Sequence, residues 1–312
     1  MDKKFELIKY MTKEINGRTL FRIRALSSFN NVHKGDLGGW IEEEENLSHE
    51  GNSWVYDNAT VYDKAKISDN AQISNNATVS NKAKVYGNAK VYGEAEIFNS
   101  VKIYGSAKIY DNAKIHYRVE LYDNTEIFGN TKIFGRESNN DDSNYEIKLY
   151  GNSRMHGNAE IIKGSYGYYS VSIYDNAEIF GNVSIRINGN IKIYGDAKIF
   201  DNALSYGELE LYDSAQIYGE AQINNGIVKV FGHAKIHDKA VLKENVKTFD
   251  HARIYGNALV WGNAQIFGHA EIYGNANIHG DTEVSGNTRI LGDAQITKVS
   301  EYFIINHIGP KD

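Results

Sequence analysis

Histidine is the side chain in this sequence whose type and placement best suit chemistry. His116, His156, His237 and His279 each follow an aliphatic residue of a repeated pattern. Imidazole exchanges protons near neutral pH, so these four are the candidate catalytic bases. No carboxylate stands at a fixed spacing to orient His156, as a base activated by a third group would require, and no motif of the sequence matches a known catalytic pattern. The catalytic residues therefore stay unknown at this level.

A second histidine set is defined by its spacing. His233, His251 and His269 recur every 18 residues. If the chain coils with that period, the three rings stack in a column. The column is either a structural ladder without a ligand or a site for a transition metal, for which imidazole is a common ligand.

Two polar segments interrupt the repeat and are the candidate recognition loops, since excursions from a rigid scaffold often carry function. Residues 137–146 are acidic and polar, and residues 165–170 have the Tyr, Ser and Gly composition of adaptable binding loops. The alternative is a tolerated insertion into solvent. The candidate binding residues are Asp141, Asp142, Tyr145, Tyr166, Tyr168 and Tyr169. The expected partner there is a protein or a small-molecule ligand.

A six-residue repeat from Ser53 onward must position all of these side chains. Residues 83–94, for example, read AKVYGNAKVYGE. Within each hexad the small and the aliphatic residue share one face of a short strand, and the polar residue between them faces the other way. The following Gly, Asp or Asn tolerates left-handed backbone and forms a corner. Regular glycines disfavour a helix, so the pattern predicts a solenoid whose stacked strands bury their inner faces.

The spacing of the interruptions indicates three strands per coil. Three hexads lie between the first and second interruptions (147–164), three between the second and Gly189-Asn190 (171–188), and six between that pair and Ile227 (191–226). Each count is a multiple of three, so every interruption leaves from the same corner of a three-sided, 18-residue coil. We call this the insertion corner, and number the faces first, second and third in chain order from it.

Aromatic residues form columns on two of the faces. The first-face column runs from Tyr86, Tyr104 and Tyr122 to Phe267, and the second-face column includes Tyr92, Tyr110 and Phe180. Aromatic neighbours one coil apart, about 4.8 Å, favour structural ladders; the alternative is a long aromatic surface that binds sugar, lipid or protein. The third face turns apolar late in the chain, at Leu204, Val241, Leu259 and Trp261. This predicts a cover, either the C-terminal tail or a second subunit in a homo-oligomer.

The predicted architecture is an all-β fold, a single-stranded, three-sided β-helix of about twelve 18-residue coils. Residues 1–52 form an N-terminal cap that begins with a β-hairpin, because Asn16-Gly17 is a strong hairpin turn signal. Residues 53–298 form the β-helix, with insertions at 137–146 and 165–170, and residues 299–312 form a C-terminal cap or tail.

Composition limits the function classes. The 312 residues include no cysteine, which excludes disulfides, thiolate metal sites and cysteine nucleophiles. The net charge of -6 argues against a nucleic-acid partner. No apolar run is long enough to span a membrane. The first residues lack the apolar core of a secretory signal, so we expect a cytoplasmic location.

The repeat resembles the hexapeptide-repeat left-handed β-helix of the acyltransferase superfamily. Residues 29–59, FNNVHKGDLGGWIEEEENLSHEGNSWVYDNA, look like the N-terminal segment of uncharacterised enterobacterial and phage-borne members assigned to the acyltransferases. The resemblance alone implies left-handed coils, since ordinary crossovers are right-handed. It also implies an enzyme that transfers acyl groups from acetyl-CoA or another acyl donor, with a histidine as general base.

Two functions stay open at this level, and whether the chain is an enzyme is undecided. Without a matching catalytic pattern, we favour a non-enzymatic binding or scaffold protein without cofactor. It would recognise its partner through the corner loops, and as a phage or prophage product it would act on a host component. The alternative is a hexapeptide-repeat acyltransferase that uses acetyl-CoA. Fold analogy alone does not decide between them.

Overall fold

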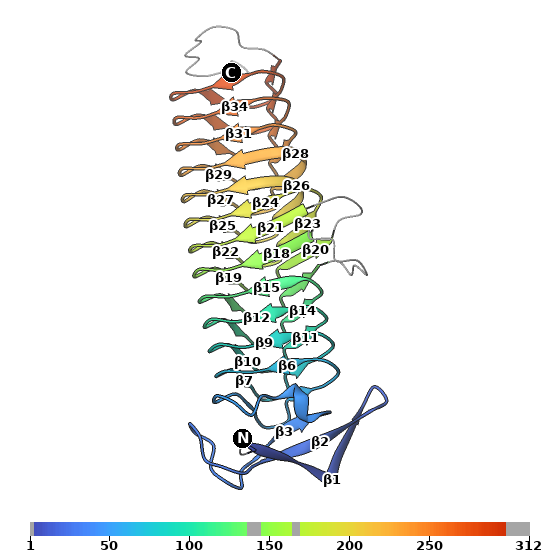
Figure 1. The fold of residues 1–312 in the computed structure, drawn as a ribbon. Coiled ribbons are helices and arrows are strands. Elements are labelled where there is room, and N and C mark those ends of the chain that lie inside the picture. Colours follow the sequence, from blue (N-terminus) through green and yellow to red (C-terminus); the bar gives the residue numbers. More distant parts are fainter. Residues whose placement is uncertain (1–2, 136–144, 164–168, 298–312) are drawn as a thin grey trace. The chain divides into compact units, whose positions relative to one another are not determined.

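The computed structural model describes residues 3–135, 145–163 and 169–297. These residues fall into two compact units. Unit 1 comprises 3–135 and 146–152, and unit 2 comprises 145, 153–163 and 169–297. Each unit is a stack of coils built from short strands (Figure 1).

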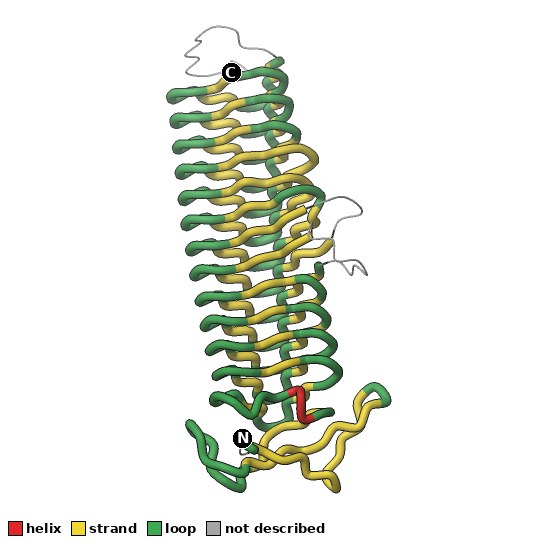
Figure 2. Tube along the Cα trace, in the orientation of Figure 1, coloured by secondary structure: helices red, strands yellow, loops and turns green. Residues whose placement is uncertain are grey.

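In unit 1 each coil contributes one strand to each of three faces, and the strands alternate with tight turns (Figure 2). The first face holds β6 (Lys66–Ile67), β9 (Lys84–Val85), β12 (Lys102–Ile103), β15 (Val119–Leu121) and β18 (Tyr145–Leu149). The second holds β4 (Trp54–Val55), β7 (Gln72–Ile73), β10 (Lys90–Val91), β13 (Lys108–Ile109) and β16 (Glu126–Ile127). The third holds β3 (Leu37–Ile41), β5 (Thr60–Val61), β8 (Thr78–Val79), β11 (Glu96–Phe98), β14 (Lys114–His116) and β17 (Lys132–Phe134).

Unit 2 repeats this plan, and two of its strands turn the insertion corner without a break: β26 (Leu204–Leu211) and β28 (Gln222–Val230). The first face also holds β21 (Tyr169–Ile173), β24 (Ile191–Ile193), β31 (Lys247–Thr248), β34 (Gln265–Ile266) and β37 (Glu283–Val284). The second holds β19 (Arg154–Met155), β22 (Glu178–Ile179), β25 (Lys198–Ile199), β27 (Gln216–Ile217), β29 (Lys235–Ile236), β32 (Arg253–Ile254), β35 (Glu271–Ile272) and β38 (Arg289–Ile290). The third also holds β20 (Glu160–Lys163), β23 (Ser184–Ile187), β30 (Val241–Lys243), β33 (Leu259–Val260), β36 (Asn277–Ile278) and β39 (Gln295–Ile296).

The register confirms the 18-residue, three-sided coil. Within uninterrupted stretches parallel partners lie 18 residues apart, as in Lys84 with Lys102 and Ile254 with Ile272. The second face supplies five strands in unit 1 and eight in unit 2, hence five and eight coils, against the roughly twelve expected in all. The handedness of the coils stays a prediction from the resemblance.

The core consists of the small and aliphatic residues of each hexad. Ala107, Ile109 and Ile254 are fully buried. Threonine can replace the small residue because its hydroxyl finds a local partner: Thr131 Oγ1 donates to the carbonyl of Phe128 at 2.6 Å. The inward assignment of the hexad is therefore correct.

The corners explain the alternation of Gly and Asp after each aromatic residue. Both residue types adopt positive φ there, 56° at Asp111 and 73° at Gly129. The N–H of Gly129 donates to Oδ2 of Asp111 in the preceding coil at 3.1 Å. Gly87 holds the same hexad position at another corner of the coil, and a Cβ there would lie 3.0 Å from the backbone nitrogen of Gly105. Aspartate thus caps an N–H in the next coil, and glycine lets two coils approach closely.

The N-terminal hairpin is present as predicted. Strands β1 (Phe5–Ile15) and β2 (Arg18–Ala25) are antiparallel and turn at Asn16-Gly17, where both φ angles are positive. Strand β2 pairs antiparallel with β3, which itself pairs parallel with β5. The solenoid ladder therefore extends into the 1–52 segment. Gly39 is required where β3 joins it, because a Cβ there would lie 2.6 Å from the carbonyl oxygen of Ala59.

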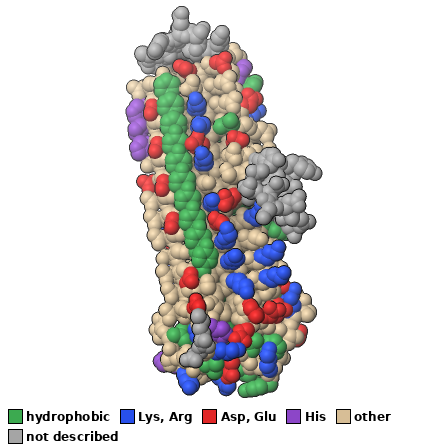
Figure 3. Space-filling model, viewed as in Figure 1, with side chains coloured by type: hydrophobic (Ala, Val, Ile, Leu, Met, Phe, Trp, Pro, Cys, Tyr) green, Lys and Arg blue, Asp and Glu red, His purple; other side chains and the backbone are tan. Residues whose placement is uncertain are grey.

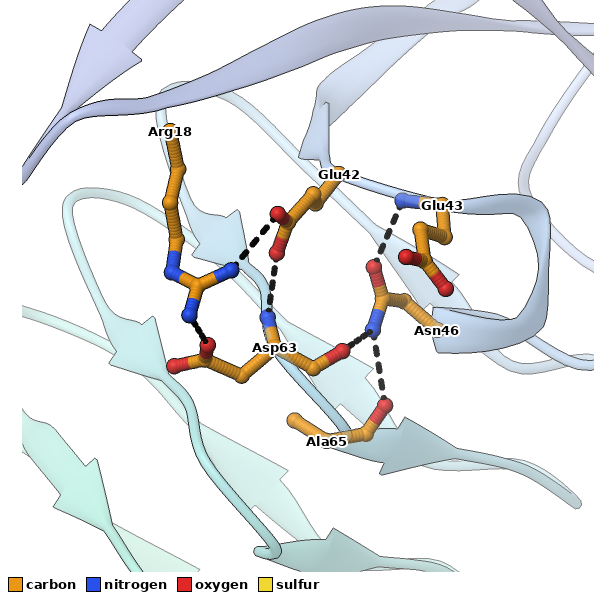
Figure 4. Close-up of polar contacts among 6 residues, drawn as sticks. All are labelled: Arg18, Glu42, Glu43, Asn46, Asp63 and Ala65. Atoms are coloured by element: carbon orange, nitrogen blue, oxygen red, sulfur yellow. Dashed lines mark hydrogen bonds and ion pairs between the residues drawn. The ribbon is translucent and has the colours of Figure 1, made fainter.

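A polar network fixes the hairpin to the first coils of unit 1 (Figure 4). Arg18 forms ion pairs with Glu42 and Asp63, and these carboxylates raise the pKa of the guanidinium. The other oxygen of Glu42 accepts the N–H of Asp63 at 2.6 Å. Asn46, in the short 3-10 helix η1 (Glu44–Asn46), donates to the carbonyls of Asp63 and Ala65 at 2.9 and 3.0 Å.

Both aromatic columns form stacked ladders. On the first face of unit 2, Tyr174, Tyr194, Tyr212, Phe231, Phe249 and Phe267 follow one another with ring centroids 4.8–4.9 Å apart. Tyr86, Tyr104, Tyr122 and Tyr150 do the same in unit 1 at 4.9–5.0 Å. Figure 3 shows a hydrophobic stripe flanked by charged side chains, as a column of stacked aromatic rings within a unit would produce. The stacking geometry supports the structural interpretation of the columns.

Candidate functional site

The interruptions of the hexad all lie between a third-face strand and a first-face strand. Residues 137–146 follow β17 in the sequence, and the last two of them belong to β18. Residues 165–170 follow β20, and the last two belong to β21, so both expected insertions end two residues earlier than the hexad count predicts. Gly189-Asn190 lies between β23 and β24. Ile227 lies within β28, which turns the same corner. The register inferred from counting hexads therefore holds.

The candidate binding residues divide at this corner. Asp141, Asp142, Tyr166 and Tyr168 lie outside the described residues. Tyr145 is the first residue of β18. Tyr169 is the first residue of β21 and only 6% exposed, so it packs into the coil.

A groove of about 410 Å³ lies at the insertion corner of unit 2. It is lined by Ser170, Asn190, Lys192, Glu208, Leu209, Glu210, Ile227 and Lys229. The second, third and fourth interruptions thus each supply a lining residue. Ser170 and Asn190 are joined directly, since the N–H and the hydroxyl of Ser170 both donate to Oδ1 of Asn190, at 3.0 and 3.1 Å.

The groove combines an apolar residue with charges of both signs. Ile227 is 46% exposed, which is unusual for isoleucine in this fold. Lys229 pairs with Glu210 at 2.6 Å, and Glu210 raises the pKa of that lysine. Ile227 could have indicated this groove from the sequence, because it is an apolar residue inserted at a corner position where the other corners carry polar residues.

His116 lies on the third face of unit 1, between aromatic rings. Its ring centroid is 4.8 Å from that of Phe98 and 4.7 Å from that of Phe134. Burial lowers its pKa below the ordinary value of 6.5. Its Nε2 is buried and has no hydrogen-bond partner among the described residues. This environment favours a neutral imidazole that fills a place in an aromatic column.

His156 has the carboxylate partner that sequence spacing did not reveal. Its Nε2 lies 3.0 Å from Oε1 of Glu178, and its ring stacks on Phe180 at 5.1 Å. Oε2 of Glu178 accepts from Lys198 Nζ at 2.9 Å. Although burial opposes it, these hydrogen bonds hold the pKa of Glu178 below its usual range. The result is a histidine–carboxylate pair on the second face of unit 2.

The other two face histidines are also members of columns. His237 stacks between Tyr218 and Tyr255 at 4.8 and 4.9 Å, and its Nδ1 lies 3.1 Å from the carboxylate of Asp238. His237 is the main cause of a lowered pKa at Asp238. His279 stacks on Trp261 at 4.6 Å. The four candidates are therefore not brought together in one site.

His233, His251 and His269 do form the predicted column, at the corner between the first and second faces of unit 2. Successive ring centroids lie 4.9 Å apart. Among the residues that the structure describes, no three His, Asp or Glu side chains are arranged to hold a metal ion. Stacked rings present their nitrogens side by side rather than toward one point, which agrees with that result.

The apolar part of the third face is half-buried within unit 2. Val241 pairs with Leu259, and Trp261 Nε1 donates to Oδ1 of Asn277 at 3.0 Å. Leu204 lies in the same column of outward residues. A homo-oligomer through this face stays a prediction, and the tail residues that were the other expected cover lie outside the described residues.

The fold and these sites define a hexapeptide-type β-solenoid protein. Residues 71–87 and 252–268 match the YdcK beta-solenoid repeat model. A protein of Escherichia coli (strain K12) named "Uncharacterized acetyltransferase YdcK" is 53% identical over 38 residues. The match covers 12% of this chain and 12% of that relative. Within the described residues, no helix has the length and apolar character to cross a bilayer.

Proposed function

We propose that this protein is a non-enzymatic β-solenoid scaffold that recognises a partner protein at the insertion corner of unit 2. One observation carries the proposal: three separate departures from the hexad, represented by Ser170, Asn190 and Ile227, line one groove. Insertions distributed at random would be spread over the three corners of the coil. Their convergence on one surface is typical of a recognition site on a rigid scaffold.

The groove's chemistry fits a short protein segment. Ile227 offers an exposed apolar contact, while Lys192, Glu208 and Lys229 surround it with charges of both signs. A partner side chain packed on Ile227 would bury apolar surface, and the surrounding charges would select its flanking residues. Tyr166 and Tyr168, which precede Ser170 in the sequence, are of the residue type that binding loops use for aromatic contacts.

Affinity capture with matched variants tests this proposal. Ile227→Asp places a charge in the groove, whereas Tyr10→Asp changes a side chain that is 83% exposed on the N-terminal hairpin. We expect one protein to co-purify from lysate with the parent and with Tyr10→Asp, and to be lost with Ile227→Asp. The purified partner should then bind Ile227→Asp at least about tenfold more weakly. Equal binding to both variants, or no protein retained by the parent, would contradict the proposal.

Acetyl transfer is the second candidate, and the His156–Glu178 pair favours it. Glu178 would accept a hydrogen bond from Nε2–H of His156 and orient the ring, and the imidazole would act as the general base that takes a proton from an acceptor amine or hydroxyl. The acceptor would attack the thioester carbonyl, and the thiolate would leave and be protonated. The name of the bacterial relative points the same way.

Turnover of acetyl-CoA over a panel of amines and sugars distinguishes the two functions. His156→Ala and Glu178→Gln both remove the pair, and His279→Ala is a matched control in another column. Turnover that is lost in the first two variants and kept in the control would establish the enzyme and overturn the scaffold proposal. No turnover by the parent would leave the scaffold as the supported function.

A further inference from the structure

A second groove lies along the histidine column of unit 2. It is at a different corner of the coil from the groove lined by Ser170, Asn190 and Ile227. Its volume is about 860 Å³. It is lined by His233, Lys235, His251, Arg253, His269, Glu271, Asn287 and Arg289. All of these side chains are polar, so the groove suits a polar ligand better than an apolar one.

The lining is cationic in a chain of net charge -6. Lys235, Arg253 and Arg289 stand against one carboxylate, Glu271. Glu271 pairs with Arg289 at 3.1 Å and with Arg253 at 4.0 Å. Among the described residues Lys235 has no carboxylate partner. The groove therefore keeps a positive excess even when the histidines are neutral.

The histidines are not required by the corner that they occupy. In most other coils the equivalent position is asparagine, and it is serine at Ser106 and Ser214 and aspartate at Asp196. The asparagines hydrogen-bond along the stack: Asn70 donates to Asn88, and Asn124 to Asn152, each at 3.0 Å. Three successive coils replace that amide ladder with imidazoles 4.9 Å apart. The replacement coincides with the cationic second-face residues Lys235 and Arg253.

We propose that this groove binds a short phosphate chain, either free or as part of a nucleotide. The guanidinium groups of Arg253 and Arg289 match the geometry of phosphoryl oxygens, and Lys235 supplies a point charge. Imidazoles at regular steps of 4.9 Å place donors along an extended ligand. A phosphate chain is polar throughout and carries several charges, as the lining requires.

Binding is coupled to protonation of the three histidines. The charged groups that face them are Lys235, Arg253, Glu271 and Arg289 of the second face. At the corner itself Asp213 and Asp250 each accept the N–H of a glycine one coil further on, at 3.0 and 3.1 Å. Imidazoles gain positive charge on the acid side of neutrality, and the bound anion favours that charged form. Affinity therefore rises as the pH falls.

Calorimetric titration of the full chain with inorganic tripolyphosphate, at low salt and at pH values near 6 and near 8, tests the proposal. We expect about tenfold tighter binding near pH 6, and weaker binding on addition of salt. The triple variant His233→Asn, His251→Asn, His269→Asn reproduces the amide ladder of the other coils. It should bind about tenfold more weakly near pH 6 and lose the pH dependence, while its melting temperature stays close to that of the parent.

Two further ligands and one variant separate specific recognition from general charge attraction. Citrate has several negative charges but no phosphoryl group, and should bind at least about tenfold more weakly. ATP that binds like tripolyphosphate would show that a nucleotide-borne chain is accepted; weaker binding of ATP would assign the site to the free chain. Lys247→Gln, on the first face, should change nothing. Absence of tripolyphosphate binding, equal binding of citrate, or an unaffected histidine variant would overturn the proposal.

Discussion

His116 occupies a place that Phe98 and Phe134 hold in the adjacent coils of the same column. An imidazole there has the shape of the column but adds a nitrogen that burial leaves without a partner. The lowered pKa means that the folded chain resists protonating this ring. At the residue scale, the same hexad position can therefore hold a purely structural ring or a titrating one.

A pH prediction follows for His116. The unfolded chain protonates this histidine near its ordinary pKa of 6.5, whereas the folded chain does so only at lower pH. Its contribution to stability is thus complete above that value and is lost as the pH falls toward the folded-state pKa. His116→Phe should reduce the loss of stability between pH values near 7.5 and 5, measured by urea unfolding. An unchanged slope of stability against pH would contradict the burial effect.

Inward aliphatic residues give a second residue-scale prediction. Ile109 is fully buried between Val91 and Ile127 of the neighbouring coils. Because close-packed coils relax little, Ile109→Ala should cost about 2–5 kcal/mol of unfolding free energy. Lys90→Ala, at an exposed position on β10, should change it by less than about 0.5 kcal/mol. Urea midpoints of the two variants check this, and similar midpoints would refute the inward assignment.

At the scale of elements, the tyrosine ladder of unit 1 gives the first face a common electrostatic property. Burial raises the pKa of Tyr104 to about 12, and it also raises the pKa values of Tyr86 and Tyr122. Nearby Glu120 adds to the effect at Tyr104. Rings stacked 4.9 Å apart exclude water from each other's faces, so ionisation of any one tyrosine in the column is unfavourable.

Alkaline unfolding tests this property. The unfolded chain ionises Tyr104 near the ordinary value of 10, and the folded chain only near 12. The resulting stability is present below the lower value and is lost as the pH rises through the interval. Tyr104→Phe should therefore retain more of its neutral-pH stability near pH 11 than the parent. The measurement is urea unfolding at both pH values, and a parallel loss in parent and variant would contradict it.

The elements were predictable from the sequence because the hexad is a local signal. Alternation places Ile109 inward, and Asp or Gly after each aromatic residue marks the corner. Interactions between coils were harder to foresee. Glu178 lies beside His156 because their coils stack in register, with Arg154 opposite Glu178. The 165–170 insertion lengthens the sequence distance between these coils, so a search at fixed spacing does not reveal the pair. The two grooves likewise depend on which outward side chains stand side by side, which follows from register rather than from any motif.

At the scale of the whole molecule, each coil inside a unit contacts the coil before it and the coil after it. Strand β32 pairs with β29 and β35, and β10 pairs with β7 and β13. The free energy of unfolding of such a stack is approximately the sum of each coil's intrinsic stability and of the interaction energies between adjacent coils. A destabilising substitution in one coil should therefore lower the local stability of the adjacent coils most, and its effect should decrease with distance along the stack.

Hydrogen exchange measures this decay. Ile254→Ala removes a fully buried side chain from β32 and leaves a cavity between adjacent coils of unit 2. Amides of β29, β32 and β35 should exchange faster than in the parent, while those of β7, β10 and β13 in unit 1 keep their protection. Ile109→Ala should give the reverse pattern, because its neighbours are β10 and β16. A uniform loss of protection across both units in either variant would show that the chain opens as one cooperative block, since local opening cannot expose coils that do not touch the altered one.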